Sequence, residues 1–377
     1  MTMRKLVTVG HSYVVSLNRR LAHEMAVAGR GKWDVTCVAP EYFHGGNDLG
    51  PLTLDPSPND AYAFEGVPAY LTSRVHVFSY GRKLRSLLSH RWDLVHAWEE
   101  PYVLAGWEIS RWIQTGSKLV YRSAQSNPKR YPPPFSWFER SSMARACGWI
   151  CSGVQVEQNL LSRKGYERPH LLSPLGVDVD FFKPDARQRA RTFDELGWKG
   201  DGPPVIGFSG RLVPAKGLRV LMRALDGCTE PWRALFLGAG QMEPELRRWS
   251  ARYGDNVRIL RVPHDAVPSY VNAMDVLCAP SQTTPSWREQ FGRMLVEAFA
   301  CGVPVIGSNS GEIANVVGSA GVIVDETDVA AWTRNIQDLL ASPRKRRELG
   351  NIGLELARSR YTWPVIARDY LSFFETL

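Results

Sequence analysis

Short apolar runs alternate with longer amphipathic stretches along most of the chain, and this pattern limits the fold more than any other feature. Apolar runs of roughly four to eight residues are typical of buried strands, whereas apolar residues three or four positions apart are typical of helices. Strands that alternate with helices are usually joined by crossover connections, which make them parallel neighbours in one sheet. The sequence therefore predicts an α/β fold built from doubly wound, Rossmann-like sheets.

The first half of the chain carries seven strand-like runs. We expect strands at 5–10, 33–40, 69–80, 93–98, 118–122, 149–153 and 170–174. Helix-like stretches between them lie at 16–29, 102–113 and 156–165. The segment 41–60 is rich in Gly, Pro, Asn and Asp, and its composition predicts a long loop.

The second half repeats the alternation. We expect strands at 204–209, 233–238, 257–262, 276–280, 304–307 and 321–325, and helices at 218–226, 244–253, 267–274, 293–301 and 329–341. The polar, proline-bounded stretch 181–203 is the best linker candidate. We therefore predict domains at 1–183 and 184–358, and a C-terminal helix at 359–377 that crosses back to the first domain. Two doubly wound domains would face each other across a cleft, and ligands of such sheets bind beyond the carboxyl ends of the strands.

The composition of the chain predicts where in the cell the protein acts and the charge of its partners. No stretch approaches the roughly 18 apolar residues that a membrane-spanning helix needs, and the short apolar run near the N-terminus reads as a strand rather than a signal peptide. We therefore expect a cytoplasmic protein with reduced, mostly buried cysteines. The formal net charge of +8 favours anionic partners. The densest basic clusters, at 82–85 and 344–347, are interpreted as solvated helix faces.

A glycine-rich turn follows the expected strand at 204–209. Gly210 comes directly after the strand, Arg211 and Lys216 follow, and a helix is expected to begin near Gly217. Glycines allow a close approach of the backbone to a ligand, and two cations beside a helix N-terminus suit a diphosphate. The alternative is an ordinary turn with two exposed cations.

Two carboxylates eight residues apart mark a second segment. Gly292 is expected to open a helix, so that Glu289 lies in the preceding loop and Glu297 about one and a half turns inside. Glu289 would then reach a ligand above the helix N-terminus, where the backbone N–H groups of Phe291 and Gly292 could meet phosphate oxygens. The alternative is two surface glutamates at an ordinary helix start. A third segment contains Asp178 and Asp180, which we interpret as part of an interdomain connector and not as a metal site.

Taken in order, these segments resemble the retaining glycosyltransferases of family 4, which have the two-domain GT-B fold. The chain reads P-L-G-V-D-V-D-F-F-K-P at 174–184, G-R-L-V-P-A-K-G at 210–217 and E-Q-F-G-R-M-L-V-E-A-F-A-C-G at 289–302. The similarity continues through 302–317, 321–328 and 361–363, so that it covers about 173–377. Met274 stands where the family often has alanine.

The resemblance implies roles for individual residues on the donor side. Arg211 and Lys216 would hold the diphosphate of a nucleotide sugar and stabilise the leaving group, next to Gly210. Glu289 would contact the transferred sugar, and Glu297 would bind the ribose hydroxyls. The remaining donor contacts that it implies are the backbone at Phe291 and Gly292 and, near the base, Arg261 and Val262. Arg211, Lys216 and Glu289 would be the catalytic residues, and no bound metal or other cofactor is expected.

The N-terminal half follows the family less closely. Gly10 and Ser12 stand at the first turn, where relatives carry a glycine pair that approaches the diphosphate, and His11 between them is interpreted as a packed or solvent-exposed histidine. Gln125 stands where relatives often have a histidine near the donor sugar, and it is an acceptor-side candidate.

Three further residues, at the end of the strand expected at 93–98, are acceptor-side candidates. They are His96, Glu99 and Glu100, and strand-end side chains of open sheets often line a ligand site. Aromatic residues and prolines at 131–139 lie among basic side chains and suggest contact with an anionic membrane or a glycan. The alternative for this segment is a proline-ordered turn ahead of a buried helix.

The resemblance thus implies a retaining hexosyltransferase that uses a UDP- or GDP-sugar and a saccharide, lipid-linked or small-molecule acceptor. Polysaccharide or glycoconjugate biosynthesis in the cytoplasm, peripherally at the inner membrane face, would be its setting. A nucleotide-sugar epimerase or hydrolase on the same fold is the alternative. A dehydrogenase lacks support because the Gly238-Ala-Gly240 turn has no third glycine, and no motif for nucleic-acid binding is present.

Overall fold

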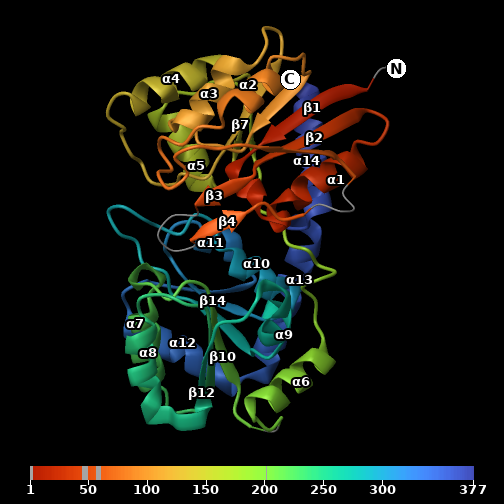
Figure 1. Ribbon diagram of the computed structural model, residues 1–377. Coiled ribbons are helices and arrows are strands. Elements are labelled where there is room, and N and C mark those ends of the chain that lie inside the picture. Colours follow the sequence, from red (N-terminus) through yellow and green to blue (C-terminus); the bar gives the residue numbers. More distant parts are fainter. Residues whose placement is uncertain (1–2, 45–49, 57–60, 201) are drawn as a thin grey trace. The chain divides into compact units, whose positions relative to one another are not determined.

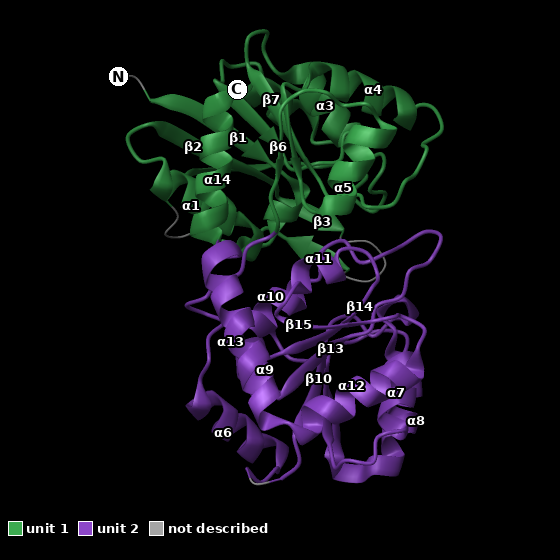
Figure 2. Ribbon diagram, turned by 180° about the vertical axis from the view of Figure 1, so that it is seen from behind, with its two compact units in different colours: residues 1–174, 363–377 green, residues 175–362 purple. Residues whose placement is uncertain are grey.

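The computed structural model describes residues 3–44, 50–56, 61–200 and 202–377, which form two compact units. Unit 1 consists of residues 1–174 and 363–377, and unit 2 consists of residues 175–362 (Figures 1 and 2). Each unit is built around its own parallel sheet. The two Rossmann-like halves predicted from the alternation of strands and helices are therefore confirmed.

Unit 1 contains a seven-stranded parallel sheet with the order β5-β2-β1-β6-β7-β8-β9 among the described residues. Its strands are β1 (Arg4–Val9), β2 (Trp33–Pro40), β5 (Ala63–Val67), β6 (Leu94–Ala97), β7 (Lys118–Ser123), β8 (Gly148–Cys151) and β9 (His170–Leu172). Its helices are α1 (Arg20–Ala28), α2 (Gly81–Leu88), α3 (Leu104–Trp112), α4 (Phe135–Arg145), α5 (Val154–Gln158) and α14 (Trp363–Thr376), with short helical turns η1 (His11–Val14), η2 (Ser16–Arg19) and η3 (Asn159–Arg163).

Unit 2 contains a six-stranded parallel sheet with the order β12-β11-β10-β13-β14-β15 in the described part of the chain. Its strands are β10 (Val205–Ser209), β11 (Arg233–Leu237), β12 (Val257–Leu260), β13 (Val276–Ala279), β14 (Val305–Ser308) and β15 (Gly321–Val324). Its helices are α6 (Ala186–Leu196), α7 (Leu218–Asp226), α8 (Glu243–Ser250), α9 (Val267–Asn272), α10 (Arg293–Ala300), α11 (Ile313–Val317), α12 (Val329–Ala341) and α13 (Pro343–Arg360), with turns η4 (Pro214–Lys216), η5 (Ala251–Asn256) and η6 (His264–Ala266).

Both faces of the unit 2 sheet are buried, which explains its continuous apolar strands. Val205 belongs to one core, whereas Ile206 and Phe208 belong to the other, as expected when successive side chains point to opposite faces. Helices α6, α9, α10 and α13 contribute to the first core, and α7, α8 and α12 to the second. The apolar positions 218, 221, 222 and 225 give α7 the spacing of a one-sided helix, and all four are buried.

The sheet of unit 1 is covered by helices that are far apart in sequence. Helix α14, the last of the chain, packs against α1 near the N-terminus. Tyr370 and Phe374 of α14 contact the ring of His96 in β6. Helix α14 therefore belongs to unit 1, whereas residues 359–362, which the sequence placed in the same C-terminal helix, belong to unit 2.

Two expectations for the first half are wrong. Residues 69–80 form no strand; Tyr70 and Ser79 make an isolated bridge, and the next strand of the sheet is instead Ala63–Val67. The predicted loop 41–60 contains a small antiparallel pair, β3 (Tyr42–His44) and β4 (Pro51–Thr53), in which Phe43 is buried. Residues 45–49 and 57–60 of that expected loop lie outside the described residues.

The expected linker 181–203 contains a packed helix. Asp185 caps α6 by accepting hydrogen bonds from the amides of Arg187 and Gln188, and Gly197 ends it in the left-handed conformation. Phe193 on α6 is buried in the unit 2 core. The compact units change at 174/175 and 362/363, where the sequence placed boundaries at 183/184 and 358/359.

All six cysteines are free thiols, four of them buried. Burial raises the pKa of the Cys228 thiol to about 11, which disfavours its reactive thiolate form. Among the described residues, no helix combines the length and the apolar character needed to cross a membrane.

Gly217 and Gly197 test how tightly the loops of unit 2 are packed. Both have left-handed φ angles, +71° and +69°, but a Cβ on Gly217 would lie 1.7 Å from the carbonyl oxygen of Pro280, whereas a Cβ on Gly197 would meet nothing within 4 Å. We expect Gly197→Ala to lower the free energy of unfolding by about 1–2 kcal/mol through strain alone. Gly217→Ala should cost on the order of 4 kcal/mol or more, because it adds a backbone clash. Denaturant unfolding of both variants checks this; equal costs would show that the two loops do not meet.

Candidate active site

The sheet of unit 2 has its switch point between β10 and β13. From β10 the chain builds outward to β11 and β12, and then returns to add β13, β14 and β15 on the other side. Loops that leave neighbouring strands in opposite directions at such a point form a crevice at the carboxyl edge, where ligands bind. The glycine-rich turn 210–217 follows β10 directly, and β13 leads through residues 280–288 to Glu289, where the second segment singled out from the sequence begins.

The loops after β10 and β11 approach each other so closely that a side chain at Gly238 would have no room. A Cβ on Gly238 would lie 1.9 Å from the carbonyl oxygen of Gly210, and the amide of Leu212 donates a 2.9 Å hydrogen bond to Ala239. Glycine at these positions therefore brings backbone together at the edge of the sheet. The same smallness leaves backbone near Gly210 accessible to a ligand.

The main contact at this edge is a buried ion pair between Lys216 and Glu289. The Lys216 ammonium donates to Glu289 Oε2 over 2.5 Å, and the hydroxyl of Ser281 donates to the same oxygen over 2.9 Å. Lys216 is 8% exposed and Glu289 is 7% exposed. Breaking such a pair by removing one partner leaves an uncompensated buried charge, so the two side chains hold each other in place.

The loop after β14 packs against the backbone of the loop that carries Glu289. The amide of Glu312 donates a 3.0 Å hydrogen bond to the carbonyl of Glu289. Gly311 has a φ angle of +57°, and a Cβ on it would lie 1.9 Å from that carbonyl oxygen. The Glu289 carboxylate is therefore fixed by its side-chain partners and by its backbone.

Helix α10 begins where the sequence placed it. Gly292 is its N-cap, with a left-handed φ angle of +82°, and Glu297 lies within the helix. The side chain of Phe291 is buried in the core, so only its backbone is available to a ligand. Burial raises the pKa of Glu297 to about 7, although Arg293 acts in the opposite direction. Such a carboxyl changes charge near neutral pH, which is typical of functional sites.

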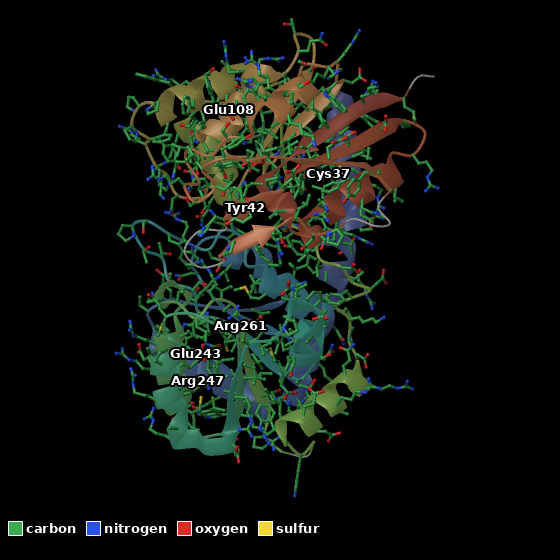
Figure 3. The ribbon with its side chains drawn as sticks, in the orientation of Figure 1. Cys37, Tyr42, Glu108, Glu243, Arg247 and Arg261 are labelled. Atoms are coloured by element: carbon green, nitrogen blue, oxygen red, sulfur yellow. The ribbon has the colours of Figure 1, made fainter. Side chains whose placement is uncertain are left out.

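The remaining donor-side candidates lie on other loops of unit 2. Arg211 is exposed directly after Gly210, next to the turn that carries Lys216. Arg261, labelled in Figure 3, lies beyond the end of β12 and is exposed. Val262 next to it is half-buried. The structure thus joins Lys216 to Glu289 by a direct contact and distributes the others along the carboxyl edge of one sheet.

Unit 1 contains a second polar cluster that the sequence did not predict as a unit. His11 Nδ1 lies 2.7 Å from Glu99 Oε2, and the His11 amide donates a 2.6 Å hydrogen bond to Glu99 Oε1. The hydroxyl of Tyr80 donates to the same Oε1 atom. His11 follows β1 and Glu99 follows β6, and these strands are neighbours at the switch point of the unit 1 sheet. No local sequence motif indicated this contact, because His11 and Glu99 are 88 residues apart.

The charge state of His11 is set by opposing influences. Burial favours the neutral ring, but the charge of Glu99, its hydrogen bond and the charge of Glu100 together raise the pKa of His11. The ring also stacks on Phe43, with 4.8 Å between the centroids. The side chain is 33% exposed, so a ligand can reach it.

Glu100 and Gln125 meet beyond β6 and β7. Glu100 Oε1 accepts hydrogen bonds from the amides of Ala124 and Gln125 at 2.8 and 3.1 Å. Burial raises the pKa of Glu100, and these hydrogen bonds act against the shift. Gln125 Oε1 in turn accepts from the amide of Asn127 at 3.0 Å, which orders the loop after β7.

His96 does not fit the ligand contact expected of it, whereas the contacts expected of Gly10 and Ser12 stay predictions. His96 is fully buried between Thr8, at 2.8 Å, and helix α14, and burial lowers its pKa to about 3; a strand-end side chain of β6 here points into the core. A Cβ on Gly10 would lie 3.1 Å from the Cβ of Trp98, so this glycine accommodates that residue. The Ser12 hydroxyl is buried and has no hydrogen-bond partner among the described residues.

Asp178 and Asp180 lie on a turn. Asp178 Oδ1 accepts hydrogen bonds from the amides of Asp180 and Phe181, as in an Asx turn. Within the described ranges, no group of three or more His, Cys, Asp or Glu side chains is arranged to hold a metal ion. The absence of a metal requirement stays a prediction.

The His11–Glu99 contact predicts a pH dependence of stability. A histidine whose pKa is raised on folding stabilises fully below its ordinary value of 6.5, and that contribution is lost as pH rises through the folded pKa. We expect the unfolding free energy of the native protein to exceed that of His11→Asn by more at pH 6 than at pH 8.5. His90→Asn, at an exposed histidine on the same unit, is the control. A difference that stays constant or grows with pH would refute a charged His11.

Comparisons with known proteins show which family the chain is similar to. Residues 190–355 match the family model described as glycosyl transferases group 1. The chain is 38% identical over 200 residues to the GDP-mannose-dependent phosphatidylinositol monomannoside mannosyltransferase of Mycolicibacterium smegmatis, covering 50% of the chain and 52% of that relative. It is 33% identical over 306 residues to the D-inositol 3-phosphate glycosyltransferase of Xylanimonas cellulosilytica, covering 75% and 72%. The match to the first of these relatives thus spans about half of that relative's length.

Solved structures establish the fold. Sucrose-phosphate synthase from Thermosynechococcus elongatus superposes with a TM-score of 0.74 at 20% identity, over 99% of this chain and 98% of that one. A glycosyltransferase from Rickettsia africae gives a TM-score of 0.76 at 14% identity, over 100% and 99%. Both likenesses extend over nearly the whole chain and correspond to the GT-B fold. From the extent of the Xylanimonas match, together with the family model, the chain belongs to the glycosyl transferases group 1 family.

Proposed function

We propose that this protein is a retaining, nucleotide-sugar-dependent hexosyltransferase whose donor site lies at the carboxyl edge of the unit 2 sheet. The observation that carries the proposal is the buried Lys216–Glu289 pair, held between glycine-rich loops at the switch point. It lies inside the segment that matches the family model. A preorganised cation beside a fixed carboxylate suits a ligand that has both a diphosphate and sugar hydroxyls.

In this proposal each donor group has its own partner. Arg211 and Lys216 bind the diphosphate, together with the backbone at Gly210, Phe291 and Gly292. Glu289 accepts hydrogen bonds from the transferred sugar, and Glu297 accepts them from the ribose. Arg261 and Val262 contact the base. The support is that all of these residues lie on loops or helix starts at one edge of one sheet.

The chemistry follows from stabilising the leaving group. The bond between the anomeric carbon and the diphosphate oxygen breaks, and Arg211 and Lys216 offset the charge that develops on that oxygen. The acceptor hydroxyl forms its new bond on the same face of the sugar, and its proton passes to the departing phosphate. This course retains the anomeric configuration and consumes no cofactor, and we propose that no metal ion takes part.

The relatives suggest which donor to try first. The printed name of the Mycolicibacterium relative specifies GDP-mannose, so a GDP-hexose is the leading donor and a UDP-hexose the second. We propose a saccharide, lipid-linked or small-molecule acceptor, and a place in polysaccharide or glycoconjugate biosynthesis. No observation favours the alternative of an epimerase or hydrolase.

A cytoplasmic protein bound peripherally to the inner face of an anionic membrane is part of the same proposal. Trp137 on α4 is 58% exposed, and Lys129, Arg130 and Arg140 nearby in sequence are exposed cations. Flotation with vesicles that contain phosphatidylglycerol should carry the protein with the lipid, whereas pure phosphatidylcholine should not. Absence of binding to both vesicles would remove this part of the proposal.

The transfer reaction itself can be tested with purified protein. GDP-mannose and, separately, UDP-glucose are incubated with and without a panel of acceptors, and the release of nucleoside diphosphate is measured. We expect release to depend on an acceptor, and the glycoside product to have the anomeric configuration of the donor by NMR. Equal release with and without acceptor would identify a hydrolase, and intact donors of every kind would contradict the proposal.

Glu297 predicts a pH dependence of nucleotide binding. Only the ionised carboxylate accepts hydrogen bonds from both ribose hydroxyls, and with a pKa of about 7 that form is mostly absent at pH 6. We expect calorimetric affinity for the nucleoside diphosphate to be several-fold to about tenfold weaker at pH 6 than at pH 8. Glu297→Gln should bind about tenfold more weakly at pH 8 and show less dependence on pH. The ligand itself titrates identically in both experiments, so the difference in pH dependence between the native protein and Glu297→Gln reports on Glu297 alone. Identical pH dependence of the two affinities would show that Glu297 does not contact the ribose.

Lys216 is expected to act mainly on turnover. Lys216→Met should lower kcat by about 100-fold, because it removes one stabilising charge from the leaving group. It also leaves Glu289 buried without its partner, so Lys216→Met/Glu289→Gln is compared to separate stability from chemistry. The double variant should regain melting temperature but not turnover. Recovery of turnover with stability would show that the lysine acts only in folding. Arg219→Ala, at an exposed cation on α7, should leave kcat unchanged.

A further inference from the structure

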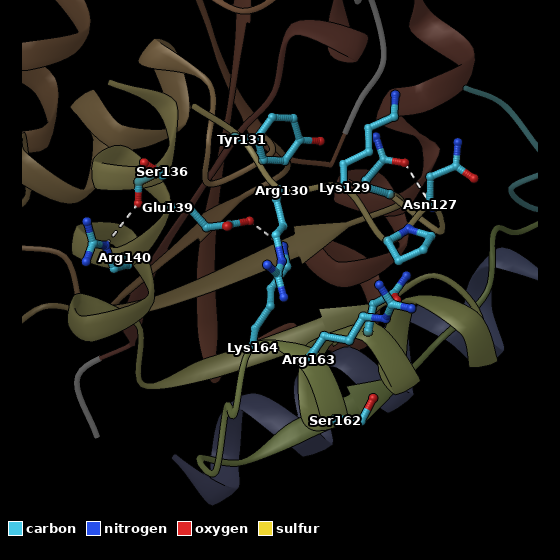
Figure 4. Close-up of a pocket in the computed structure, with 13 residues that line it drawn as sticks. Asn127, Lys129, Arg130, Tyr131, Ser136, Glu139, Arg140, Ser162, Arg163 and Lys164 are labelled. Atoms are coloured by element: carbon cyan, nitrogen blue, oxygen red, sulfur yellow. Dashed lines mark hydrogen bonds and ion pairs between the residues drawn. The ribbon is translucent and has the colours of Figure 1, made fainter. Parts of the chain in front are cut away.

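Unit 1 contains a basic pocket that the proposed donor chemistry does not use. It has a volume of about 770 Å³, and its lining residues come from segments that follow β7 and β8 in the chain. Its wall comes from three segments: the loop after β7, the start of α4, and η3 with Lys164 directly after it (Figure 4). Every lining residue belongs to unit 1, whereas the donor-side residues belong to unit 2.

The charge of this pocket is strongly one-sided. Five cations line it, and Glu139 is the one carboxylate among the lining residues. The cations are Lys129, Arg130, Arg140, Arg163 and Lys164. Glu139 pairs with Lys164, as the dashed line in Figure 4 marks. In the described part of the chain, the other four cations have no carboxylate within ion-pair distance.

Crowded like charges without counterions destabilise a folded protein, so this arrangement indicates an anion that arrives from outside. Lys129, Arg130 and Arg163 are all exposed, so that their charged ends are available to a ligand. Arginine presents a planar fork of N–H donors that matches phosphate oxygens in pairs. A carboxylate offers two oxygens and one charge, whereas a phosphate ester offers three oxygens and up to two charges, so a phosphate can engage several of these cations at once.

The rest of the pocket is suited to hydroxyl groups. Gln125, Asn127 and Asn159 contribute amides, and Ser136 and Ser162 contribute hydroxyls. Asn159 Nδ2 donates a 2.6 Å hydrogen bond to the carbonyl of Ser126, which fixes the amide against the loop after β7. The volume lies in the range of sites for small organic ligands and far exceeds the space that one phosphate ion needs.

We propose that this pocket binds the acceptor substrate through a phosphate ester attached to a polyhydroxylated ring. This inference rests on the proposed transferase function, and it specifies the acceptor class. Arg130 and Arg163 bind the phosphate, and the amides of Gln125 and Asn159 hold ring hydroxyls. Glu139 keeps Lys164 directed along the wall and limits the excess of positive charge.

The position of the pocket supports an acceptor. Gln125 is one of the lining residues, and its backbone amide donates a hydrogen bond to the carboxylate of Glu100, which follows the neighbouring strand β6. The pocket thus continues the carboxyl edge that also carries His11 and Glu99. Ligands of open parallel sheets bind at this edge, and unit 1 has no donor-side residue in the proposal above.

The first test measures binding directly, so that it does not depend on turnover. Calorimetry compares inorganic phosphate, glucose 6-phosphate and glucose as probes. We expect glucose 6-phosphate to bind at least about tenfold more tightly than glucose, and its affinity to fall as salt is raised. The variant Arg130→Ala/Arg163→Ala should lose about tenfold or more of this affinity. Arg82→Ala/Arg85→Ala removes the same charge from the exposed face of α2 in the same unit and should bind as the native protein does.

The phosphate ester can come from a soluble sugar phosphate or from a lipid headgroup. Vesicles of phosphatidylcholine with phosphatidylinositol are compared with pure phosphatidylcholine, for the native protein and both double variants. Competition by glucose 6-phosphate for vesicle binding identifies the lipid headgroup as a ligand of the pocket. Binding of glucose 6-phosphate without any binding of vesicles identifies a soluble acceptor. Equal vesicle binding by both double variants would assign the lipid contact to general charge and overturn the lipid arm.

Two outcomes overturn the inference as a whole. Glucose and glucose 6-phosphate could bind equally, or Arg130→Ala/Arg163→Ala could bind glucose 6-phosphate as the native protein does. Binding of nucleoside diphosphate to unit 2, measured on the same variant, separates this failure from a failure of the proposed function. If nucleoside diphosphate still binds but glucose 6-phosphate binds no more tightly than glucose, the proposed acceptor class is rejected and the proposed transferase function is not.

Discussion

The buried ion pair of Lys216 and Glu289 is the interaction on which the unit 2 site depends. Two opposite charges that are each less than one tenth exposed are stable only if the surrounding backbone holds them together. That backbone comes from the loops after β10, β13 and β14, which approach one another at Gly217 and Gly311 so closely that neither position has room for a side chain. Glycine at these two positions therefore allows three loops to meet at one point of the sheet edge, where their backbone holds the two charged side chains together.

Unit 1 arranges its charges differently. Its carboxylates, Glu99 and Glu100, are enclosed by donors from neighbouring loops, and Glu99 keeps the ring of His11 in place. Its cations gather further along the same edge, in the basic pocket, where all but one lack a carboxylate partner among the described residues. In our proposal unit 2 thus neutralises its own lysine until a donor binds, whereas unit 1 leaves cations available for an anionic acceptor.

The strands of unit 2 could be predicted from the sequence to within one or two residues. Each is a short, mostly apolar run, because both faces of the sheet are covered, and short runs bounded by turn residues favour strands. Residues 69–80 were misread because apolar residues there are spread over a turn, and only a bridge between Tyr70 and Ser79 closes it. Helix α6 was missed because its polar side chains outweigh the few apolar ones that reach the core.

The site was predictable in its residues but not in its contacts. Local motifs pointed to Lys216 and Glu289 one at a time, and their hydrogen bond joins positions 73 residues apart. His96 illustrates the opposite case: a polar residue at a strand end was expected at the surface, but helix α14 from the far end of the chain covers it. The basic pocket had no signal as a unit, because its cations come from three separate segments.

The central claim is that the edge formed by Lys216, Glu289 and Glu297 binds the nucleoside diphosphate part of a sugar donor. A thermal-shift screen of GDP, UDP and ADP, with NAD and a short DNA duplex as controls, tests it most directly, since a ligand that binds only the folded protein raises its stability. We expect a selective rise in melting temperature with one of the diphosphates and none with NAD or DNA. No shift with any diphosphate, together with a shift for NAD or DNA, would contradict the donor site and leave only the fold.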